Sequence, residues 1–228
     1  MSKKKIAIQG ELGAYSHIAA ENLYKDSEIK TCTTFEETFK QAYNDPSYKI
    51  VIPIENSLAG RVADIHYLLP KYKLQIHGEH FQAVEHNLLC KPDATISDIK
   101  FVRSHAQAIG QCQNLITKKK FKPIISADTA GSAKDLAEGK DKTIAAIASE
   151  LSAKIYNLKI LEKNIEDEKG NVTRFLIMGK NIEQPEFKEE KKFITSCIFR
   201  VKSEPSALYK CLGGFATNQV NLTKLESF

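Results

Sequence analysis

The stretch Ile50-Val51-Ile52-Pro53-Ile54-Glu55-Asn56-Ser57 joins an apolar run to three polar residues at the point where the run ends. Apolar runs of this length are typical of strands that are buried on both faces, as in parallel sheets. Short apolar runs alternate with amphipathic segments along the chain before and after this stretch. The alternation predicts an α/β fold with largely parallel sheets.

Two long segments are expected to connect two lobes. Residues 74–90 are extended and poor in turn residues, so they suit a passage from one lobe into another, and the strand at residues 172–178 is placed to return the chain. We therefore predict a cleft between a first lobe of about residues 1–76 plus 160–180 and a second lobe of about residues 77–159. Further strands are expected at residues 5–8, 31–35, 100–102 and 123–125, and helices at residues 17–25, 36–44, 61–69, 106–117 and 132–138.

The pattern restarts after a charged linker at residues 181–192. Glu204-Pro205-Ser206 suits the start of a helix, because proline is tolerated in a first helical turn. A strand at residues 193–201, a helix at about 207–216 and a strand at 221–225 predict the β-α-β beginning of a small domain within residues 193–228.

Composition and charge limit the classes of protein. A length of 228 residues with 42% hydrophobic and 27% charged residues is ordinary for a globular protein of one or two domains. The net charge of +5 mildly favours an anionic small substrate. The lysine clusters at residues 3–5 and 118–120 are not accompanied by an aromatic-rich strand or a recognition helix, as a nucleic-acid-binding surface would be. No apolar run reaches the length of a membrane span, and residues 6–8 are too short for a signal-peptide core. We expect no nucleic-acid or membrane partner.

Cysteines and histidines give no clear metal pattern. His77, His80 and His86 lie close together, but they lack the H-E-x-x-H spacing of a zinc site and a cysteine partner. We expect no metal, and zinc held by these histidines is the alternative. The chain has five cysteines, which are scattered and include no C-x-x-C pair: Cys32, Cys90, Cys112, Cys197 and Cys211. Reduced thiols in a cytoplasmic protein are the simplest interpretation.

Polar residues that suit helix caps or anion binding follow the expected strands. Residues 10–17 form a glycine-containing loop before a helix, where backbone amides attract carboxylates. Asn56 or Ser57 can cap the next helix, whereas Glu55 and Asn56 can equally lie at the carboxyl edge of the sheet, where α/β proteins bind ligands. Both interpretations stay open on these residues alone.

Three more segments share this character. Ser104 and Gln107 fit a capping box, but a capping box does not require Gln111, which lies one helical turn beyond Gln107. Residues 128–132 are a helix start with Asp128 or Thr129 as the expected cap. In the strand segment 171–175, alternation would place Thr173 and Phe175 on one face and Arg174 on the other.

The order and spacing of these segments together are specific, although each is weak alone. The set GAYSH, PIENS, SHAQAIGQC, DTAGSA and NVTRF stands at residues 13–17, 53–57, 104–112, 128–133 and 171–175. Over essentially the whole chain, it resembles the prephenate dehydratase family. The resemblance implies a catalytic domain similar to type II periplasmic binding proteins, with two α/β lobes around a cleft. It also implies that residues 193–228 begin a ferredoxin-like ACT domain, which senses L-phenylalanine.

The resemblance also implies roles for individual residues. Thr173 matches the essential catalytic threonine of the family, and Gln111 and Asn56 are expected to act beside it. The expected substrate-binding residues are Glu55, Ser57, Ser104, Gln107, Thr129, Ala130, Gly131, Ser132, Arg174 and Phe175. The expected regulatory residues are Ser206, Ala207, Leu208, Glu226 and Ser227. Ser206 stands where the family usually has glycine, and Phe228 replaces an arginine after Glu226-Ser227, so we expect a weak response to L-phenylalanine.

The expected reaction converts prephenate to phenylpyruvate, CO2 and water, and it needs no cofactor because aromatisation drives it. Thr173 would donate a hydrogen bond to the departing oxygen, while amide side chains and helix amides hold the carboxylates. An arogenate dehydratase and a non-catalytic two-lobed module that binds a small molecule are the alternatives. A homodimer or homotetramer is expected from the ACT resemblance.

Overall fold

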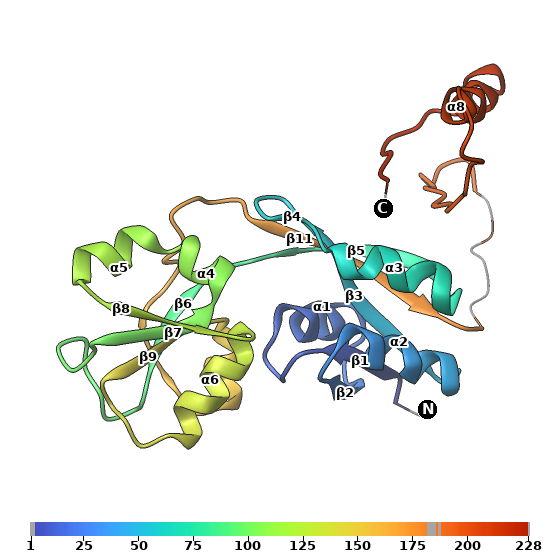
Figure 1. Ribbon diagram of the computed structural model, residues 1–228. Helices are drawn as coiled ribbons and strands as arrows, with labels where there is room; N and C mark the ends of the chain where they lie inside the picture. Colours follow the sequence, from blue (N-terminus) through green and yellow to red (C-terminus); the bar gives the residue numbers. More distant parts are fainter. Residues whose placement is uncertain (1–2, 182–185, 187, 228) are drawn as a thin grey trace. The chain divides into compact units, whose positions relative to one another are not determined.

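The chain forms two units, Met1–Pro185 and Glu186–Phe228, in a computed structural model that describes residues 3–181, 186 and 188–227. The first unit contains two sheets, and each sheet is the centre of one lobe (Figure 1). The two-lobed α/β architecture expected for this unit is confirmed.

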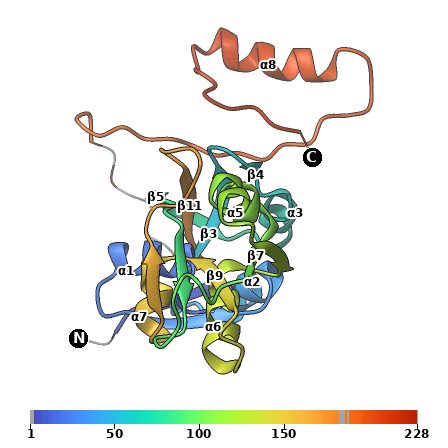
Figure 2. The same ribbon diagram turned by 90° about the vertical axis from the view of Figure 1, so that its left-hand side faces the viewer.

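The first lobe is a mixed sheet with helices on both faces. Its strands run in the order β2-β1-β3-β11-β5, and β4 pairs with β3. The first three are parallel to one another, whereas β11 is antiparallel to both of its neighbours. The strands are β1 (Lys5–Gln9), β2 (Glu28–Cys32), β3 (Tyr48–Asn56), β4 (Gly60–Arg61), β5 (Gln75–Ala83) and β11 (Val172–Gly179). Helix α1 (Tyr15–Leu23) covers one face, and α2 (Phe35–Asn44) and α3 (Ala63–Tyr72) cover the other (Figure 2).

The second lobe has a five-stranded sheet in the order β10-β6-β9-β7-β8. The strands are β6 (Asn87–Cys90), β7 (Phe101–His105), β8 (Lys122–Ser126), β9 (Ile144–Ala148) and β10 (Lys159–Glu162). Helices α4 (Ala106–Gly110) and α5 (Gln113–Lys119) pack on one face, and α6 (Thr129–Glu138) and α7 (Glu150–Ile155) on the other. Strands β7, β8 and β9 are parallel, so their carboxyl ends lie at one edge.

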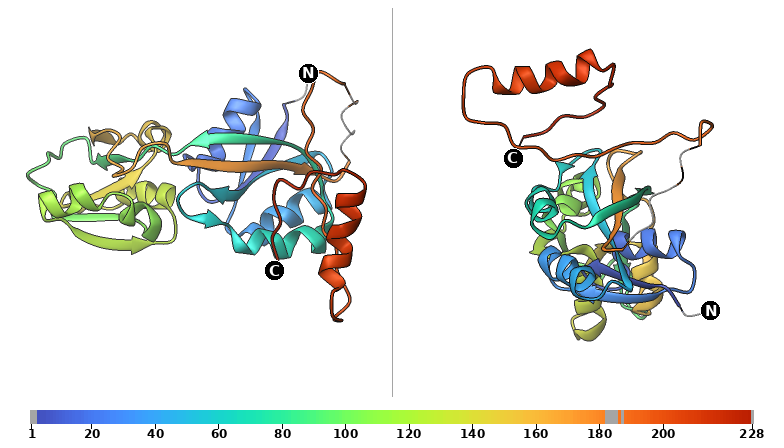
Figure 3. Two further views of the ribbon diagram at one scale, coloured as in Figure 1. Left: turned by 90° about the horizontal axis from the view of Figure 1, so that it is seen from above. Right: turned by 90° about the vertical axis from the view of Figure 1, so that its right-hand side faces the viewer.

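The chain passes between the lobes twice, after β5 and before β11, which lie side by side (left view of Figure 3). The Val84 amide donates to the Asn171 carbonyl at 2.9 Å, and this bond ties the two passages together. The expected boundaries at residues 76 and 160 were placed too early. Strand β5 belongs to the first sheet because it pairs with β11, and β10 belongs to the second because it pairs with β6.

Other differences from the expected elements are local. The strand expected at residues 31–35 is β2, which begins at Glu28 and pairs with β1. The helix expected at residues 106–117 is interrupted between α4 and α5, at Gln111 and Cys112. Strand β9 and helix α7 were not anticipated, although β9 is an entirely apolar run, Ile144–Ala148.

The second unit contains the helix α8 (Ala207–Thr217), close to the expected residues 207–216. The strands expected at residues 193–201 and 221–225 are wrong, because neither segment forms a ladder in the described part of the unit. Extended segments become strands when a neighbour pairs with their backbone. No described helix of either unit is long and apolar enough to cross a membrane.

Candidate active site

A β-bulge places Asn56 opposite Thr173. Between β3 and β11, the register changes after Phe175 pairs with Pro53, so that Arg174 pairs with Glu55 and Thr173 with Asn56. A bulge of this kind turns side chains to the other face of a strand. As a result, the threonine and the asparagine lie at the same edge of the first sheet, beside the passage between the lobes.

Asn56 is held in one orientation by backbone amides. Its Oδ1 accepts from the amides of Leu58 at 3.1 Å and Ala59 at 2.9 Å. Its Nδ2 therefore faces β11, where it donates to Thr173 Oγ1 at 2.9 Å and to Asn171 Oδ1 at 2.6 Å. Because Thr173 Oγ1 accepts this bond, and no bond among the described residues uses its hydrogen, the hydroxyl is left to donate to a ligand. Thr173 is 8% exposed.

The second lobe contributes Gln111 to the same network. The break between α4 and α5 leaves Gln111 at the end of α4, with its Oε1 beside Asn171, the residue that precedes β11. Asn171 Nδ2 donates to this oxygen at 3.1 Å, and His86 Nε2 lies 3.0 Å from it. Gln111 was expected in the site, and the structure joins it to Asn56 and Thr173 through Asn171.

The network continues to a buried histidine and a tyrosine. Since Gln111 Oε1 is an acceptor, His86 Nε2 carries the hydrogen, and Nδ1 lies 3.0 Å from the Tyr15 hydroxyl. With the hydrogen on Nε2, Nδ1 can only accept, so the single Tyr15 hydroxyl hydrogen is shared between Nδ1 and the Glu85 carbonyl, 2.6 Å away. Burial lowers the pKa of His86 and raises the pKa of Tyr15 well above its usual value, so both side chains are neutral near pH 7.

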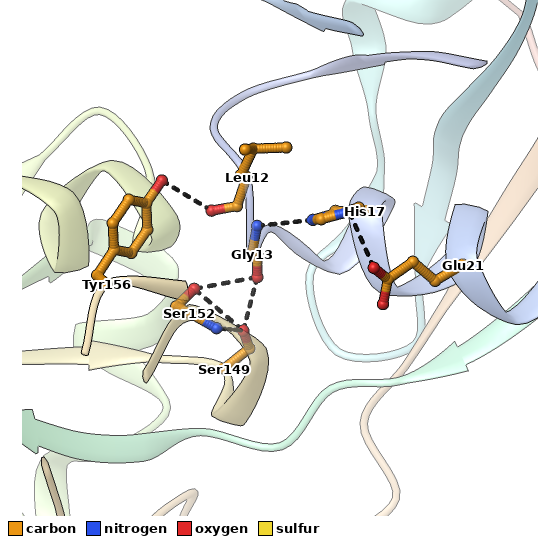
Figure 4. Close-up of polar contacts among 7 residues, drawn as sticks. All are labelled: Leu12, Gly13, His17, Glu21, Ser149, Ser152 and Tyr156. Carbon is orange, nitrogen blue, oxygen red and sulfur yellow. Dashed lines mark hydrogen bonds and ion pairs between the residues drawn. The ribbon is translucent and has the colours of Figure 1, made fainter. Parts of the chain in front are cut away.

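A clamp at Gly13 joins the two lobes (Figure 4). The Gly13 carbonyl accepts from Ser149 Oγ at 2.6 Å and from Ser152 Oγ at 3.1 Å. The Gly13 amide donates to His17 Nδ1 at 3.0 Å, and Tyr156 donates to the Leu12 carbonyl at 3.0 Å. Glycine is required at position 13 for two reasons: its φ is +91°, and a Cβ there would lie 2.8 Å from Ser152 Cα.

A groove with a volume of about 310 Å³ adjoins this clamp. Both lobes line it, α1 with Tyr15 and α7 with Ser149 and Leu151. Tyr15 therefore belongs both to the groove and to the hydrogen-bonded network that ends at Thr173.

Glu55 and Arg174, both expected to bind substrate, form an ion-pair cluster with Glu79. Arg174 Nη2 is 2.7 Å from Glu79 Oε2, and its Nη1 is 3.6 Å from Glu55 Oε1. The register pairs these residues with one another rather than with Asn56 or Thr173. This ion-pair cluster fixes β3, β11 and β5 beside the site, so contact of Glu55 or Arg174 with substrate stays a prediction.

Four further expected substrate-binding residues have other surroundings. Ser104 is fully buried, and its hydroxyl donates to the Ile147 carbonyl at 2.7 Å. Phe175, 2% exposed, packs in the core beneath α1. Gln107 is exposed, and Ser57 Oγ accepts from the Val172 amide at 2.9 Å. The capping box is wrong, because α4 begins after His105, whose Nδ1 accepts from the Gln107 amide.

Asp128, one of the two expected caps, caps the start of α6. Asp128 Oδ1 accepts from the Gly131 amide at 2.6 Å, and Ser132 Oγ donates to the Asp128 carbonyl at 2.8 Å. A Cβ on Gly131 would lie 2.8 Å from the Asp128 carboxylate, so the cap requires glycine there. The amides of Thr129 and Ala130 begin the helix and have no partner within it, and Thr129 is half-buried whereas Ala130 is fully buried.

The histidines considered for zinc do not gather in the described residues, which contain no group of three or more side chains suited to a metal ion. His86 contacts Gln111 and Tyr15, and His80 Nε2 lies 3.3 Å from Gln82 Oε1.

The expected regulatory residues belong to the second unit. Ser206 precedes α8 with a φ of +64°, a conformation that favours glycine, and Ala207 and Leu208 begin the helix. Glu226 pairs with Lys224 at 3.3 Å, and Ser227 follows it. Ser206 is therefore in a strained backbone conformation.

Three residues of the network were not assigned from the sequence: Tyr15, His86 and Asn171. Tyr15 and Asn171 lie inside recognisable segments, but nothing in those segments distinguishes them from ordinary loop residues. His86 was considered as a zinc ligand. Its partners in the structure are Tyr15 and Gln111, which lie 71 and 25 residues away in the chain.

Comparison with known proteins identifies a family. The family model described as prephenate dehydratase matches residues 6–183. The chain is 41% identical to a "Bifunctional N-acyl-homoserine lactone acylase/prephenate dehydratase" of Komagataeibacter europaeus, covering 98% of this chain and 79% of that protein. It is also 41% identical to "Arogenate dehydratase/prephenate dehydratase 2, chloroplastic" of Arabidopsis thaliana, covering 99% of this chain and 59% of that protein. A crystal structure of the Arthrobacter aurescens prephenate dehydratase in complex with L-Phe superposes with a TM-score of 0.86 at 25% identity, covering 98% of this chain and 75% of that one.

Proposed function

Because the chain belongs to the prephenate dehydratase family, whose members are hydro-lyases, we propose that the site around Thr173 converts prephenate to phenylpyruvate. The bond from the ring to its carboxylate breaks to release CO2, and the electron pair enters the ring. The C–O bond to the ring hydroxyl breaks in turn, and the departing hydroxide takes up one proton to become water. The ring becomes aromatic, so the protein has to bind a dianion and stabilise the leaving oxygen.

The observation that carries this proposal is the bond from Asn56 Nδ2 to Thr173 Oγ1, at 2.9 Å. It occupies an acceptor position of the hydroxyl and leaves the Thr173 hydrogen as a donor. A donor fixed beside the leaving oxygen stabilises the negative charge that develops there, an effect that contributes about 3–4 kcal/mol in comparable sites. Asn56 itself is held by two backbone amides, so this donor is oriented before substrate arrives.

Binding of the two carboxylates is assigned to amide groups. The side-chain oxygen of Gln111, Oε1, accepts from Asn171 and lies within hydrogen-bond distance of His86. The side-chain NH2 group of Gln111 is therefore the part that remains for substrate. The Thr129 amide at the start of α6 is only half-buried, and it suits a carboxylate because a helix start attracts anions. Glu11 and Lys134 pair at 3.2 Å between the β1–α1 loop and α6, and this contact helps to hold that helix near the first lobe.

The relatives give two further candidate substrates. The Arabidopsis relative is named for arogenate as well as prephenate, and the Komagataeibacter relative for an N-acyl-homoserine lactone. The groove of about 310 Å³ between α1 and α7 is lined partly by Ile18, Ala83 and Leu151, so it offers apolar surface to an acyl chain. The site at Thr173 contains no described feature that separates a ketone from an ammonium group, so prephenate and arogenate have to be compared directly.

The test is to supply the purified chain with prephenate, arogenate and an N-acyl-homoserine lactone in parallel. Phenylpyruvate, L-phenylalanine and free homoserine lactone are the three products to measure. Phenylpyruvate formation with the highest kcat/KM of the three supports the proposal. A higher kcat/KM for arogenate would make the chain an arogenate dehydratase, and product from the lactone alone would exclude the proposed reaction.

The second unit is proposed as the beginning of an ACT domain that binds L-phenylalanine and pairs with a second copy of the chain. Supporting this, α8 has no buried residue within its unit, and Leu208 and Tyr209 are 48% and 80% exposed. The complex of the Arthrobacter relative with L-Phe supports the choice of effector. Calorimetry with L-phenylalanine and light scattering of the purified chain test these two statements. Since Ser206 is strained, we expect weak binding.

We also propose that the protein works in the cytoplasm. Cys32, Cys90 and Cys112 are free and buried, which suits a reducing compartment. Fractionation of cells that express the protein under its own promoter tests this location.

A further inference from the structure

We propose that His86 is a positioning residue for catalysis, which acts by orienting the Gln111 carboxamide. This inference rests on the proposed function, because it assigns to His86 a share in preparing Gln111 for substrate. His86 lies on the first passage between the lobes, and it is 2% exposed. It is therefore placed to act through Gln111 rather than by touching substrate.

The direction of each hydrogen bond between Asn56 and His86 follows from the orientation of the Asn56 carboxamide. The amides of Leu58 and Ala59 can only donate, so they define which side of the Asn56 carboxamide is oxygen. Asn56 Nδ2 then requires Asn171 to present its oxygen, and Asn171 Nδ2 requires the same of Gln111. At the end of this chain, His86 Nε2 faces an oxygen and must carry the hydrogen.

Two donors therefore converge on Gln111 Oε1, at 3.1 Å from Asn171 and 3.0 Å from His86. A carbonyl oxygen has two lone pairs, so its capacity is filled. No hydrogen bond within the described part of the chain uses Gln111 Nε2, and the NH2 group is thus the part directed at a ligand. Without His86, one lone pair is unsatisfied and the carboxamide gains freedom to rotate.

The backbone fixes the distance between the two residues. The amide of His86 donates to Glu166 Oε2 at 2.9 Å, and its carbonyl accepts from the Ile165 amide at 2.9 Å. The Asp167 amide donates to the Gln111 carbonyl at 2.7 Å. One short segment, residues 165–167, thereby holds both His86 and Gln111, as expected for a pair whose relative position matters.

The first test compares His86→Phe with His86→Gln. Phenylalanine removes the donor, and we expect kcat/KM for prephenate to fall by about 10- to 100-fold, the range for displacing a positioning group. Glutamine restores an N–H donor, and we expect it to recover most of that loss. His66→Phe is the matched control, because His66 is also buried but lies on α3 beside the Val62 carbonyl. Equal losses in His86→Phe and His86→Gln would overturn the proposal.

The second test is a double-mutant cycle with Gln111→Ala. If His86 acts through Gln111, His86→Phe changes kcat/KM by less than about twofold when Gln111 is already absent. A purely structural role would instead multiply the two losses, which would contradict the proposal.

A third measurement separates this proposal from the proposed function. In a crystal structure of His86→Phe, the Gln111 carboxamide is expected to turn away from its position in the unsubstituted protein, whatever the substrate proves to be. An unchanged carboxamide would overturn the role of His86. Absence of prephenate turnover in the unsubstituted protein would instead overturn the proposed function.

Discussion

Asn56 Nδ2 donates a hydrogen bond to Thr173 Oγ1 across 2.9 Å, joining residues 117 positions apart in the chain. The bond exists because a bulge in the β3–β11 ladder brings the two residues opposite each other. It gives the threonine a defined orientation. Asn56 Nδ2 also donates to Asn171 Oδ1, and Asn171 in turn donates to Gln111 in the second lobe.

Substitution Asn56→Asp tests whether this bond matters. A carboxylate in place of the NH2 group would accept the Thr173 hydrogen, so the hydroxyl would no longer donate to the leaving oxygen. We expect kcat to fall by about 100-fold, as for loss of one donor to a developing anion. Asn22→Asp, a change of the same type at an exposed bond to Gln82, is the control and should leave kcat unchanged. A kcat within threefold of the unsubstituted enzyme would count against the assignment.

Substitution Glu79→Gln tests the separate role of the Arg174 cluster. Because Glu79 pairs with Arg174 at 2.7 Å and is 32% exposed, its loss should lower the free energy of unfolding by about 0.5–1 kcal/mol. KM for prephenate should change by less than about twofold, since successive residues of a strand point to opposite faces and Arg174 follows Thr173 in β11. Urea unfolding and steady-state kinetics on the same preparation check both statements. A large rise in KM with unchanged stability would place Arg174 in contact with substrate.

Substitution Gly13→Ala tests the clamp between the lobes. Gly60→Ala is its matched control, because Gly60 also has a positive φ, +79°, but a Cβ there meets nothing within 4 Å. Both changes carry the backbone penalty, whereas Gly13→Ala also collides with Ser152. We expect Gly13→Ala to lower the free energy of unfolding by about 1–3 kcal/mol more than Gly60→Ala does. Equal losses would mean that the lobes separate readily in solution.

The sequence predicts those features of the fold and site that depend on residues close together in the chain, and it does not predict contacts between residues far apart in the chain. The α/β alternation, the passages near residues 74–90 and 172–178, and the Asp128 cap are consequences of local pattern, and the structure confirms them. Strand alternation alone could not predict that Asn56 and Thr173 meet, because the bulge changes the register between them.

The same limit applies to Gln111 and Ser104. The expected continuous helix ends at Gly110, and this break is what places Gln111 beside Asn171. Ser104 looked like a cap in sequence, but the neighbouring strand β9 supplies the Ile147 carbonyl as its partner. Each outcome depends on a residue more than 40 positions away, which local pattern does not contain.

Stability should depend on pH through His86. Burial holds its pKa below 6.5 in the folded state, so between the folded pKa and about 6.5 the unfolded chain binds a proton that the folded chain does not. Stability therefore increases with pH across this window, and it is lost as the pH falls below about 6.5. We expect His86→Gln to lose less stability than the unsubstituted protein between pH 7.5 and pH 5.5 in urea unfolding. Identical losses would show that His86 has an ordinary pKa in the folded state.

The Thr173 hydroxyl is assigned as the donor to the departing oxygen of prephenate. Thr173→Val keeps the shape of the side chain and removes that donor, so the most direct measurement is its rate of phenylpyruvate formation under saturating prephenate. We expect kcat to fall by at least about 100-fold while the melting temperature stays within a few degrees. A folded Thr173→Val variant that forms phenylpyruvate at close to the unsubstituted rate would contradict the claim.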